Sequence, residues 1–176
     1  LSALRLAQQS KTNRKWAVQV LTKIADIDMQ RLDWRQALRI FEQLRSIQPE
    51  DAASRMQIIN INLRLGQHPA ALKEIDNYVK TLEEMKKTKE VVTFLNELIK
   101  EYPDNTDIRR RLMDAFIRYG QTSKAIQQMD KLADLLLDKG EKWEAIEMVE
   151  AIIAMNPPNS NQYKMLLQQI KTEEKK

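Results

Sequence analysis

The sequence contains no cysteine and a single histidine among its 176 residues. Without cysteine the chain has no disulfide framework, no thiol nucleophile and no thiolate zinc site. One imidazole also cannot supply the second histidine that many metal sites need. Most familiar enzyme chemistry is thereby excluded, and we expect no catalytic residues, no metal and no cofactor.

Glycine and long apolar runs are equally scarce. Three scattered glycines cannot build a phosphate-cradling loop, because such a loop exposes several backbone amides together. The apolar stretches, such as 135–137, are only a few residues long, so no membrane span is expected. The 29 basic and 25 acidic side chains give a net charge of only +4, which makes nucleic acid an unlikely partner.

A chain of 176 residues is long enough to bury a sizeable core without covalent staples. It begins at Leu1 rather than at methionine and ends in Lys175 and Lys176, so we expect a fragment of a longer protein. The absence of cysteine agrees with the cytoplasm, which is the predicted location.

Helix-breaking residues are present in a regular series. Between them apolar residues recur every three or four positions, which predicts amphipathic helices, and no segment has the pattern of a strand. The breakers are Pro49, Gly66, Pro69, Pro103, Gly120, Gly140, Pro157 and Pro158. The predicted helices cover 14–31, 35–48, 52–65, 69–86, 88–102, 106–119, 122–139, 142–156 and 160–173, and a short helix precedes them.

The helical pattern repeats at an offset of 54 positions (106 minus 52). When residues 52–105 are laid over 106–159 without a gap, Gly66 meets Gly120 and Pro103 meets Pro157. We therefore predict one helical-repeat domain over residues 1–176. Its units are about 1–51 (partial), 52–105, 106–159 and 160–176 (partial). Because each unit hides its apolar stripe against a neighbour, exposed apolar end faces suited to self-association are expected.

The segment 32–41, with the sequence LDWRQALRIF and followed by Pro49, resembles the tetratricopeptide repeat. The family pattern places an alanine, here Ala37, four residues before a phenylalanine, here Phe41. Similar segments begin at the three glycines. The resemblance implies an all-α, right-handed α-solenoid of antiparallel helices, and in this chain the offset between repeats spans three helices.

The alanine-type positions of these segments are unevenly spaced. Ala37, Ala71, Val91, Ala125 and Ala145 follow one another at intervals of 34, 20, 34 and 20 positions, whereas a plain two-helix repeat would keep the first interval throughout. Two architectures fit this spacing. One is a solenoid with three helices per unit, which we prefer. The other consists of hairpins that share helices and turn alternate faces inward.

In the family that the sequence resembles, peptides usually lie along a groove lined by the first helix of each repeat. In this chain the corresponding helices are 52–65, 106–119 and 160–173. Their polar faces form a basic, amide-bearing strip that suits a protein or peptide partner, an acidic one in particular. The competing interpretation is an ordinary solvated helix face. The candidate groove residues are Gln57, Asn60, Arg64, Arg110, Arg111, Asp114, Arg118, Lys164 and Gln168.

Two further groups of residues have structural rather than functional interpretations. Trp16, Trp34 and Trp143 stand beside alanines, so we expect them to pack between helices. Residues 109–111 are consecutive arginines that point in three directions from a helix, which predicts charge spread over the surface.

The sequence thus favours a non-catalytic protein–protein interaction scaffold that binds its partner in a groove of the helical array. Two alternatives stay open. One is a nucleic-acid-binding helical-repeat module, whose affinity would fall steeply with added salt. The other is a regulatory or oligomerisation arm of a larger protein.

Overall fold

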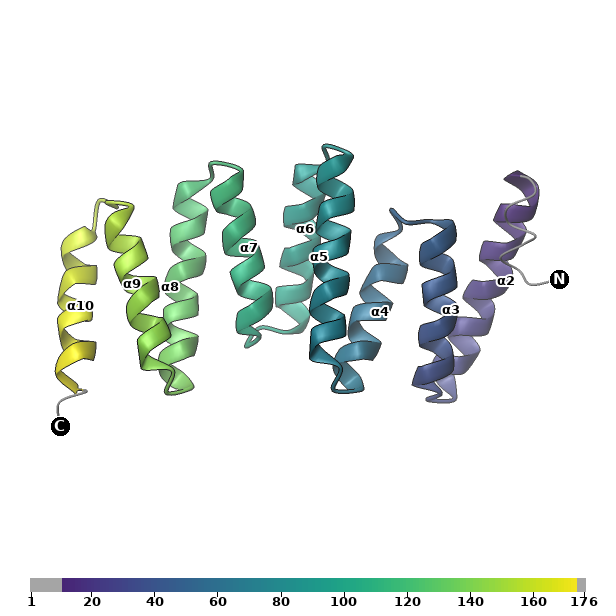
Figure 1. Cartoon of the computed structure of the whole chain (residues 1–176), viewed down its shortest axis with the longest axis horizontal. Helices are drawn as coiled ribbons and strands as arrows, with labels where there is room; N and C mark the ends of the chain where they lie inside the picture. Colours follow the sequence, from purple (N-terminus) through teal and green to yellow (C-terminus); the bar gives the residue numbers. More distant parts are fainter. Residues whose placement is uncertain (1–10, 174–176) are drawn as a thin grey trace. The chain divides into compact units, whose positions relative to one another are not determined.

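The computed structural model describes residues 11–173, which form α-helices joined by short turns and contain no strand (Figure 1). Each helix predicted between residues 14 and 173 is present, with both ends within a few residues of the prediction. The short helix predicted before them lies outside the described residues. The helices are α2 (Lys11–Gln30), α3 (Trp34–Ile47), α4 (Ala52–Arg64), α5 (His68–Glu84), α6 (Thr88–Glu101), α7 (Thr106–Arg118), α8 (Thr122–Asp138), α9 (Lys142–Ala154) and α10 (Ser160–Glu173).

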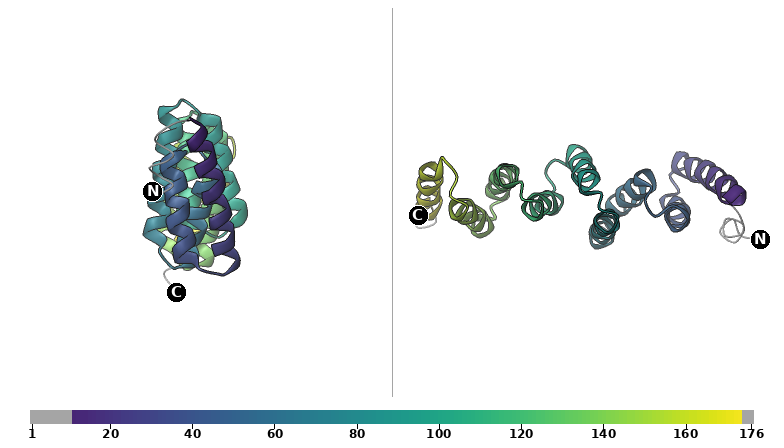
Figure 2. Two further views of the ribbon diagram at one scale, coloured as in Figure 1. Left: turned by 90° about the vertical axis from the view of Figure 1, so that its right-hand side faces the viewer. Right: turned by 90° about the horizontal axis from the view of Figure 1, so that it is seen from above.

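The chain divides into two compact units, Leu1–Lys87 and Thr88–Lys176, called unit 1 and unit 2 below. Within each unit, consecutive helices run antiparallel and pack against each other. The helices of each unit alternate between two rows (Figure 2). In unit 1, α2 and α4 form one row and α3 and α5 the other. In unit 2, α6, α8 and α10 form one row and α7 and α9 the other.

Helix starts are fixed by side chains that accept hydrogen bonds from unpaired backbone amides. The Asp51 carboxylate, just before α4, accepts from the Ser54 amide at 2.9 Å. The Asn105 side chain, just before α7, accepts from the Ile108 amide at 3.0 Å. The two capping residues are 54 positions apart (105 minus 51), which is compatible with the predicted period.

Helix ends confirm the role predicted for glycine. Gly66 and Gly120 follow α4 and α7 with φ values of 70° and 68°, and Gly140 follows α8 with φ of 76°. This left-handed geometry suits glycine because it has no Cβ. Lys86 and Leu32 stand one and two repeat offsets before Gly140 (140 minus 54 is 86, and 86 minus 54 is 32), and they adopt the same region with φ of 60° and 59°.

The core lies along the contacts between successive helices. All five alanine-type positions, from Ala37 to Ala145, are 0% exposed. A small side chain at such a buried position allows antiparallel helices to approach closely. Larger side chains such as Phe41 and Leu44 in unit 1 and Leu136 and Ile152 in unit 2 fill the space beside them.

The tryptophans do not share one environment, so the prediction that all three pack between helices is wrong for two of them. Trp34 is partly buried and packs against the core of unit 1. Trp16 and Trp143 are 51% and 71% exposed. Trp34 precedes its alanine by three residues and shares its helix face. Trp143 precedes Ala145 by two, a rotation of roughly 200°, and therefore points away from it.

Candidate functional site

A groove with a volume of about 650 Å³ lies on one side of unit 1. It runs between α2 and α4, and α3 forms its floor, because both outer helices pack against α3. Phe41 and Leu44 of α3 are buried beneath it, and Val18 and Met29 of α2 add apolar surface. The polar lining residues are Thr22, Asp26, Gln30, Gln48, Asp51, Ser54 and Gln57.

The charged side chains in this lining are acidic. Asp51 is engaged in capping α4, where its carboxylate accepts from both the amide and the hydroxyl of Ser54. Asp26 of α2 is the other carboxylate of the lining, which contains no lysine or arginine. The apolar floor and amide-bearing edge therefore form a groove that is neutral to acidic.

Three predicted site residues lie together on one face of α4. Gln57 lines the groove, and Asn60 and Arg64 follow it at spacings of three and four residues, which keeps them on the same side of the helix. The Arg64 guanidinium lies over the ring of Trp34, 5.3 Å from its centroid. That contact holds one cation beside the groove rather than inside it.

Four predicted residues lie on α7 in unit 2. Arg110 forms an ion pair with Glu144 of α9, which ties two neighbours of one row together. The Arg111 guanidinium donates to the backbone oxygen of Asp107 in its own helix at 3.0 Å. Arg118 lies over the ring of Tyr119, 5.9 Å from its centroid. The fourth residue, Asp114, is exposed.

The remaining two candidates, Lys164 and Gln168, are exposed on α10. Helix α10 belongs to the row of α8, whereas α7 belongs to the row of α9 (Figure 2). The structure of unit 2 therefore does not bring the α7 and α10 candidates into one strip. The physical reason is that α10 is the third helix after α7, and helices that alternate between two rows place it in the other row.

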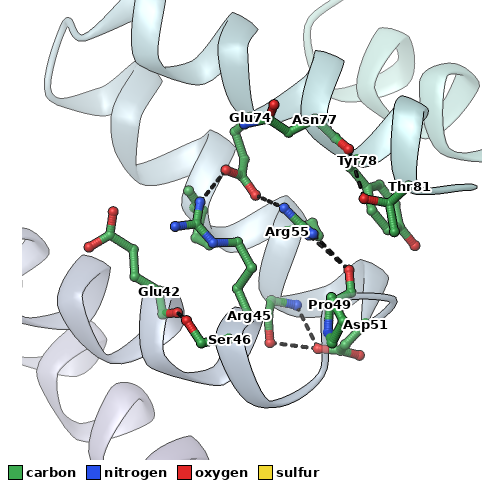
Figure 3. Close-up of polar contacts among 12 residues, drawn as sticks. Glu42, Arg45, Ser46, Pro49, Asp51, Arg55, Glu74, Asn77, Tyr78 and Thr81 are labelled. Carbon is green, nitrogen blue, oxygen red and sulfur yellow. Dashed lines mark hydrogen bonds and ion pairs between the residues drawn. The ribbon is translucent and has the colours of Figure 1, made fainter.

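Sequence reasoning missed a buried ionic cluster on the other side of unit 1 (Figure 3). Glu74 of α5 is 3% exposed and forms ion pairs with both Arg45 of α3 and Arg55 of α4. Arg55 is 5% exposed, and it donates to Glu74 at 2.6 Å and to the carbonyl oxygen of Pro49 at 2.8 Å. Two guanidinium groups thus compensate a carboxylate that would be costly to bury alone.

Arg109 is the equivalent of Arg55 in unit 2, and it is 7% exposed. It donates to the carbonyl oxygen of Pro103 at 2.8 Å and to Gln128 Oε1 at 3.0 Å, while its Nε has no hydrogen-bond partner among the described residues. Burial lowers the pKa of Arg109, and Asp104 raises it in part. The prediction of surface charge for residues 109–111 is wrong for Arg109. The sequence feature that indicates this buried role is an arginine six residues after a proline in both repeats.

An acidic row runs along α8 of unit 2. Asp130, Asp134 and Asp138 are four residues apart, so they share one helix face. Desolvation raises the pKa of Asp134, and its two acidic neighbours raise it further. Desolvation also raises the pKa of Tyr163, whose hydroxyl lies near Asp130.

Over residues 11–173 no cluster of side chains has the composition of a metal site, and no helix is long and apolar enough to cross a bilayer.

A sequence model of the tetratricopeptide repeat matches residues 77–105. This span contains the second half of α5, all of α6 and the loop that follows, and it includes Val91 and Pro103. The match confirms the predicted resemblance over that segment, which is less than half of the chain. Together with the buried alanine-type positions, it defines a tetratricopeptide-like, all-helical repeat fold, of a kind that generally mediates protein–protein interactions.

Several solved structures align with the chain at low identity. MamA from residue 41 to its end, of Desulfovibrio magneticus RS-1, is 16% identical with a TM-score of 0.39 over 89% of this chain and 96% of that one. BtubC (BKLC) from P. vanneervenii is 16% identical with a TM-score of 0.46 over 97% and 78%. YrrB, a TPR protein with an unusual peptide-binding site, is 14% identical with a TM-score of 0.32 over 86% and 90%. A search of curated protein sequences finds no significant match.

Proposed function

We propose that the chain is a non-catalytic scaffold that binds a protein or peptide partner in a groove of its helical array. The observation that supports this function best is the groove between α2 and α4. An apolar side chain of a bound segment would rest on the floor formed by Phe41 and Leu44. The amides of Gln48 and Gln57 at the edge would bond its extended backbone.

The charges of the groove restrict the segment that would occupy it. Because Asp26 and Asp51 are the charged lining residues, a segment with an apolar anchor and no net negative charge fits best. The acidic partner predicted from the sequence suits the basic positions outside this groove, such as Arg64 on α4 and Arg111 and Arg118 on α7. Its recognition by those residues remains part of the proposal.

A display library of random peptides tests the groove. Selection on the wild-type protein should enrich peptides with one apolar anchor. Thr22→Arg introduces a long cation at the edge of the groove without touching the core, and it should abolish their binding. Thr93→Arg, at an exposed position on α6, is the matched control and should bind them normally. Equal binding by the two variants would remove the groove from consideration.

The basic positions of α7 are tested by Arg111→Glu combined with Arg118→Glu. Neither side chain is buried, so folding should remain intact while binding of acidic peptides weakens. Circular dichroism checks the fold and fluorescence anisotropy measures the binding. Unchanged affinity for acidic peptides would exclude these two arginines as partner contacts.

A second candidate function is oligomerisation, and a specific surface favours it. Trp16, Ile24 and Ile27 of α2 are 51%, 38% and 45% exposed. Their spacing of eight and three residues aligns them along one face of the helix. Such an apolar stripe suits self-association or packing against another part of a larger protein. Ile24→Glu should abolish concentration-dependent sedimentation if the stripe joins copies of the chain.

Nucleic-acid binding is the weaker alternative, because the lining of the groove is acidic rather than basic. Measuring the affinity for single-stranded DNA across a salt series tests this alternative. A phosphate-driven complex loses affinity steeply as salt rises. The cytoplasmic location remains a prediction from composition.

A further inference from the structure

A second cavity, of about 440 Å³, lies between α3, α4 and α5 of unit 1. It shares no lining residue with the groove between α2 and α4. Figure 3 shows Arg45, Ser46, Arg55, Asn77 and Thr81 of its lining together with Glu74. Its lining is polar throughout and consists of Arg45, Ser46, Arg55, Asn77, Lys80, Thr81 and Glu84.

The cavity carries an excess of positive charge. Its cations are Arg45, Arg55 and Lys80, and its carboxylates are Glu84 in the lining and Glu74 beneath it. Three positive charges against two negative ones leave a net charge of one. That excess fits a single negative group.

Two of the cations retain capacity to bind. Arg45 contacts Glu74 through Nη1, while its side chain is 31% exposed and its other N–H groups have no partner among the described residues. The Lys80 ammonium lies 3.9 Å from Glu84, and both side chains are mostly exposed, so this pair contributes little. Glu74, which Arg55 also contacts, holds the Arg45 guanidinium at the cavity wall.

We propose that this cavity binds the carboxylate of an aspartate or glutamate side chain from an acidic protein segment. The planar fork of Arg45 matches a carboxylate, and Lys80 and the Asn77 amide supply donors on the opposite wall. A phosphate dianion fits less well, because it would exceed the net charge of the cavity and meet Glu84. The proposal extends the scaffold function to a second surface. It rests on the proposed function only in the assumption that the ligand is a protein.

The equivalent location in unit 2 lacks these features. The repeat offset (99 minus 45) places Ile99 opposite Arg45, Gln128 opposite Glu74 and Asp134 opposite Lys80. Arg109, opposite Arg55, is retained and buried. The repeat therefore has its structural arginine in both units, while the cations at the positions of Arg45 and Lys80 occur in unit 1 alone. Unit 2 thus supplies substitutions that this helix arrangement already accepts.

Nuclear magnetic resonance titration of the whole chain with an oligoglutamate peptide, blocked at both ends, tests the proposal. The peptide should shift the Arg45 Nε–H and the Asn77 side-chain amide. Lys80→Asp introduces the residue of unit 2 and should weaken binding about tenfold. Lys73→Asp makes the same charge change on α5 outside the cavity and should change it little. Equal losses in both variants, or no shift at Arg45, would overturn the proposal.

Additional titrations identify the ligand, and additional variants control for misfolding. Glutarate should shift the same signals only at higher concentration, and inorganic phosphate should bind more weakly than glutarate at equal ionic strength. The opposite order in either comparison overturns the assignment to a protein carboxylate. The double variant Arg45→Ile with Glu74→Gln reproduces Ile99 and Gln128, so it should fold and lose the site. Thr22→Arg blocks the groove and should leave this binding intact, which separates the two proposals.

Discussion

Arg55 and Arg109 occupy equivalent positions of the repeat and make the same contact, since each donates from Nη2 to the carbonyl oxygen of the proline six residues earlier, at 2.8 Å in both cases. Each arginine thereby ties the loop before its helix to the packed interior of its unit. The second partner differs, because Arg55 reaches Glu74 and Arg109 reaches Gln128. The two positions share a structural role in different electrostatic settings.

Removing the two arginines should therefore have unequal effects on stability. Arg55→Met leaves the buried Glu74 carboxylate with Arg45 alone and should lower the free energy of unfolding by about 3 kcal/mol. Arg109→Met leaves only neutral hydrogen-bond partners, loses the attraction of Asp104 and removes a buried Nε that has no hydrogen-bond partner. Its cost should therefore be about 1 kcal/mol. Urea denaturation of both variants measures the difference.

The double variant Arg55→Met with Glu74→Gln is the control for this prediction. It removes the stranded carboxylate and should recover part of the lost stability. If Arg109→Met proves as damaging as Arg55→Met, the difference in charge between the two sites has no energetic consequence.

The alanine-type positions should not tolerate larger side chains. Ala71 and Ala125 are both 0% exposed where helices cross, so Ala71→Leu or Ala125→Leu should cost about 1–3 kcal/mol through overpacking. Ala70→Leu places the same side chain on an exposed neighbour of Ala71 and should be nearly neutral. Thermal melts that barely move in the first two variants would contradict the assignment of these crossings.

The sequence predicted the helices and their ends because those signals are local. The periodicity of three and four residues, the left-handed glycines and the alanine-type positions each report on a few neighbouring residues. Burial of Arg109 depends instead on Gln128, which lies nineteen residues away (128 minus 109), and on the turn at Pro103. The separation of the α7 and α10 candidates depends on which row each helix joins, and no local pattern records that.

The turns after α5 and α8 offer a matched exchange of residues. Lys86 and Gly140 occupy equivalent positions, with φ of 60° and 76°, and a lysine there carries the strain that a Cβ creates. Gly140→Lys should destabilise the protein by about 1–2 kcal/mol. Lys86→Gly should stabilise it by about 0.5 kcal/mol, because the relief of strain is partly offset by the entropy of glycine in the unfolded chain. Chemical denaturation at one pH checks both signs, and a stabilising Gly140→Lys would contradict the geometry.

The acidic row of α8 gives a prediction for the pH dependence of stability. The pKa of Asp134 is raised above 3.8 by desolvation first and by Asp130 and Asp138 second. A carboxyl whose pKa is higher in the folded state stabilises the fold below its unfolded pKa, and this contribution is lost as the pH rises through the folded value. Asp134→Asn removes the charged form, so it should raise stability at neutral pH. The gain should shrink as the pH falls toward 3.8.

Asp114→Asn on α7 is the matched control. Arg110 and Arg118 lie four residues before and after Asp114, whereas Asp134 has an aspartate at each of the same two spacings. Loss of that carboxylate removes attraction rather than repulsion, so the control should be neutral or slightly destabilising at neutral pH. Urea denaturation of the wild type and both variants, repeated from acidic to neutral pH, measures the two trends. A gain for Asp134→Asn that persists or grows in acid would show that the charge of Asp134 is not its source.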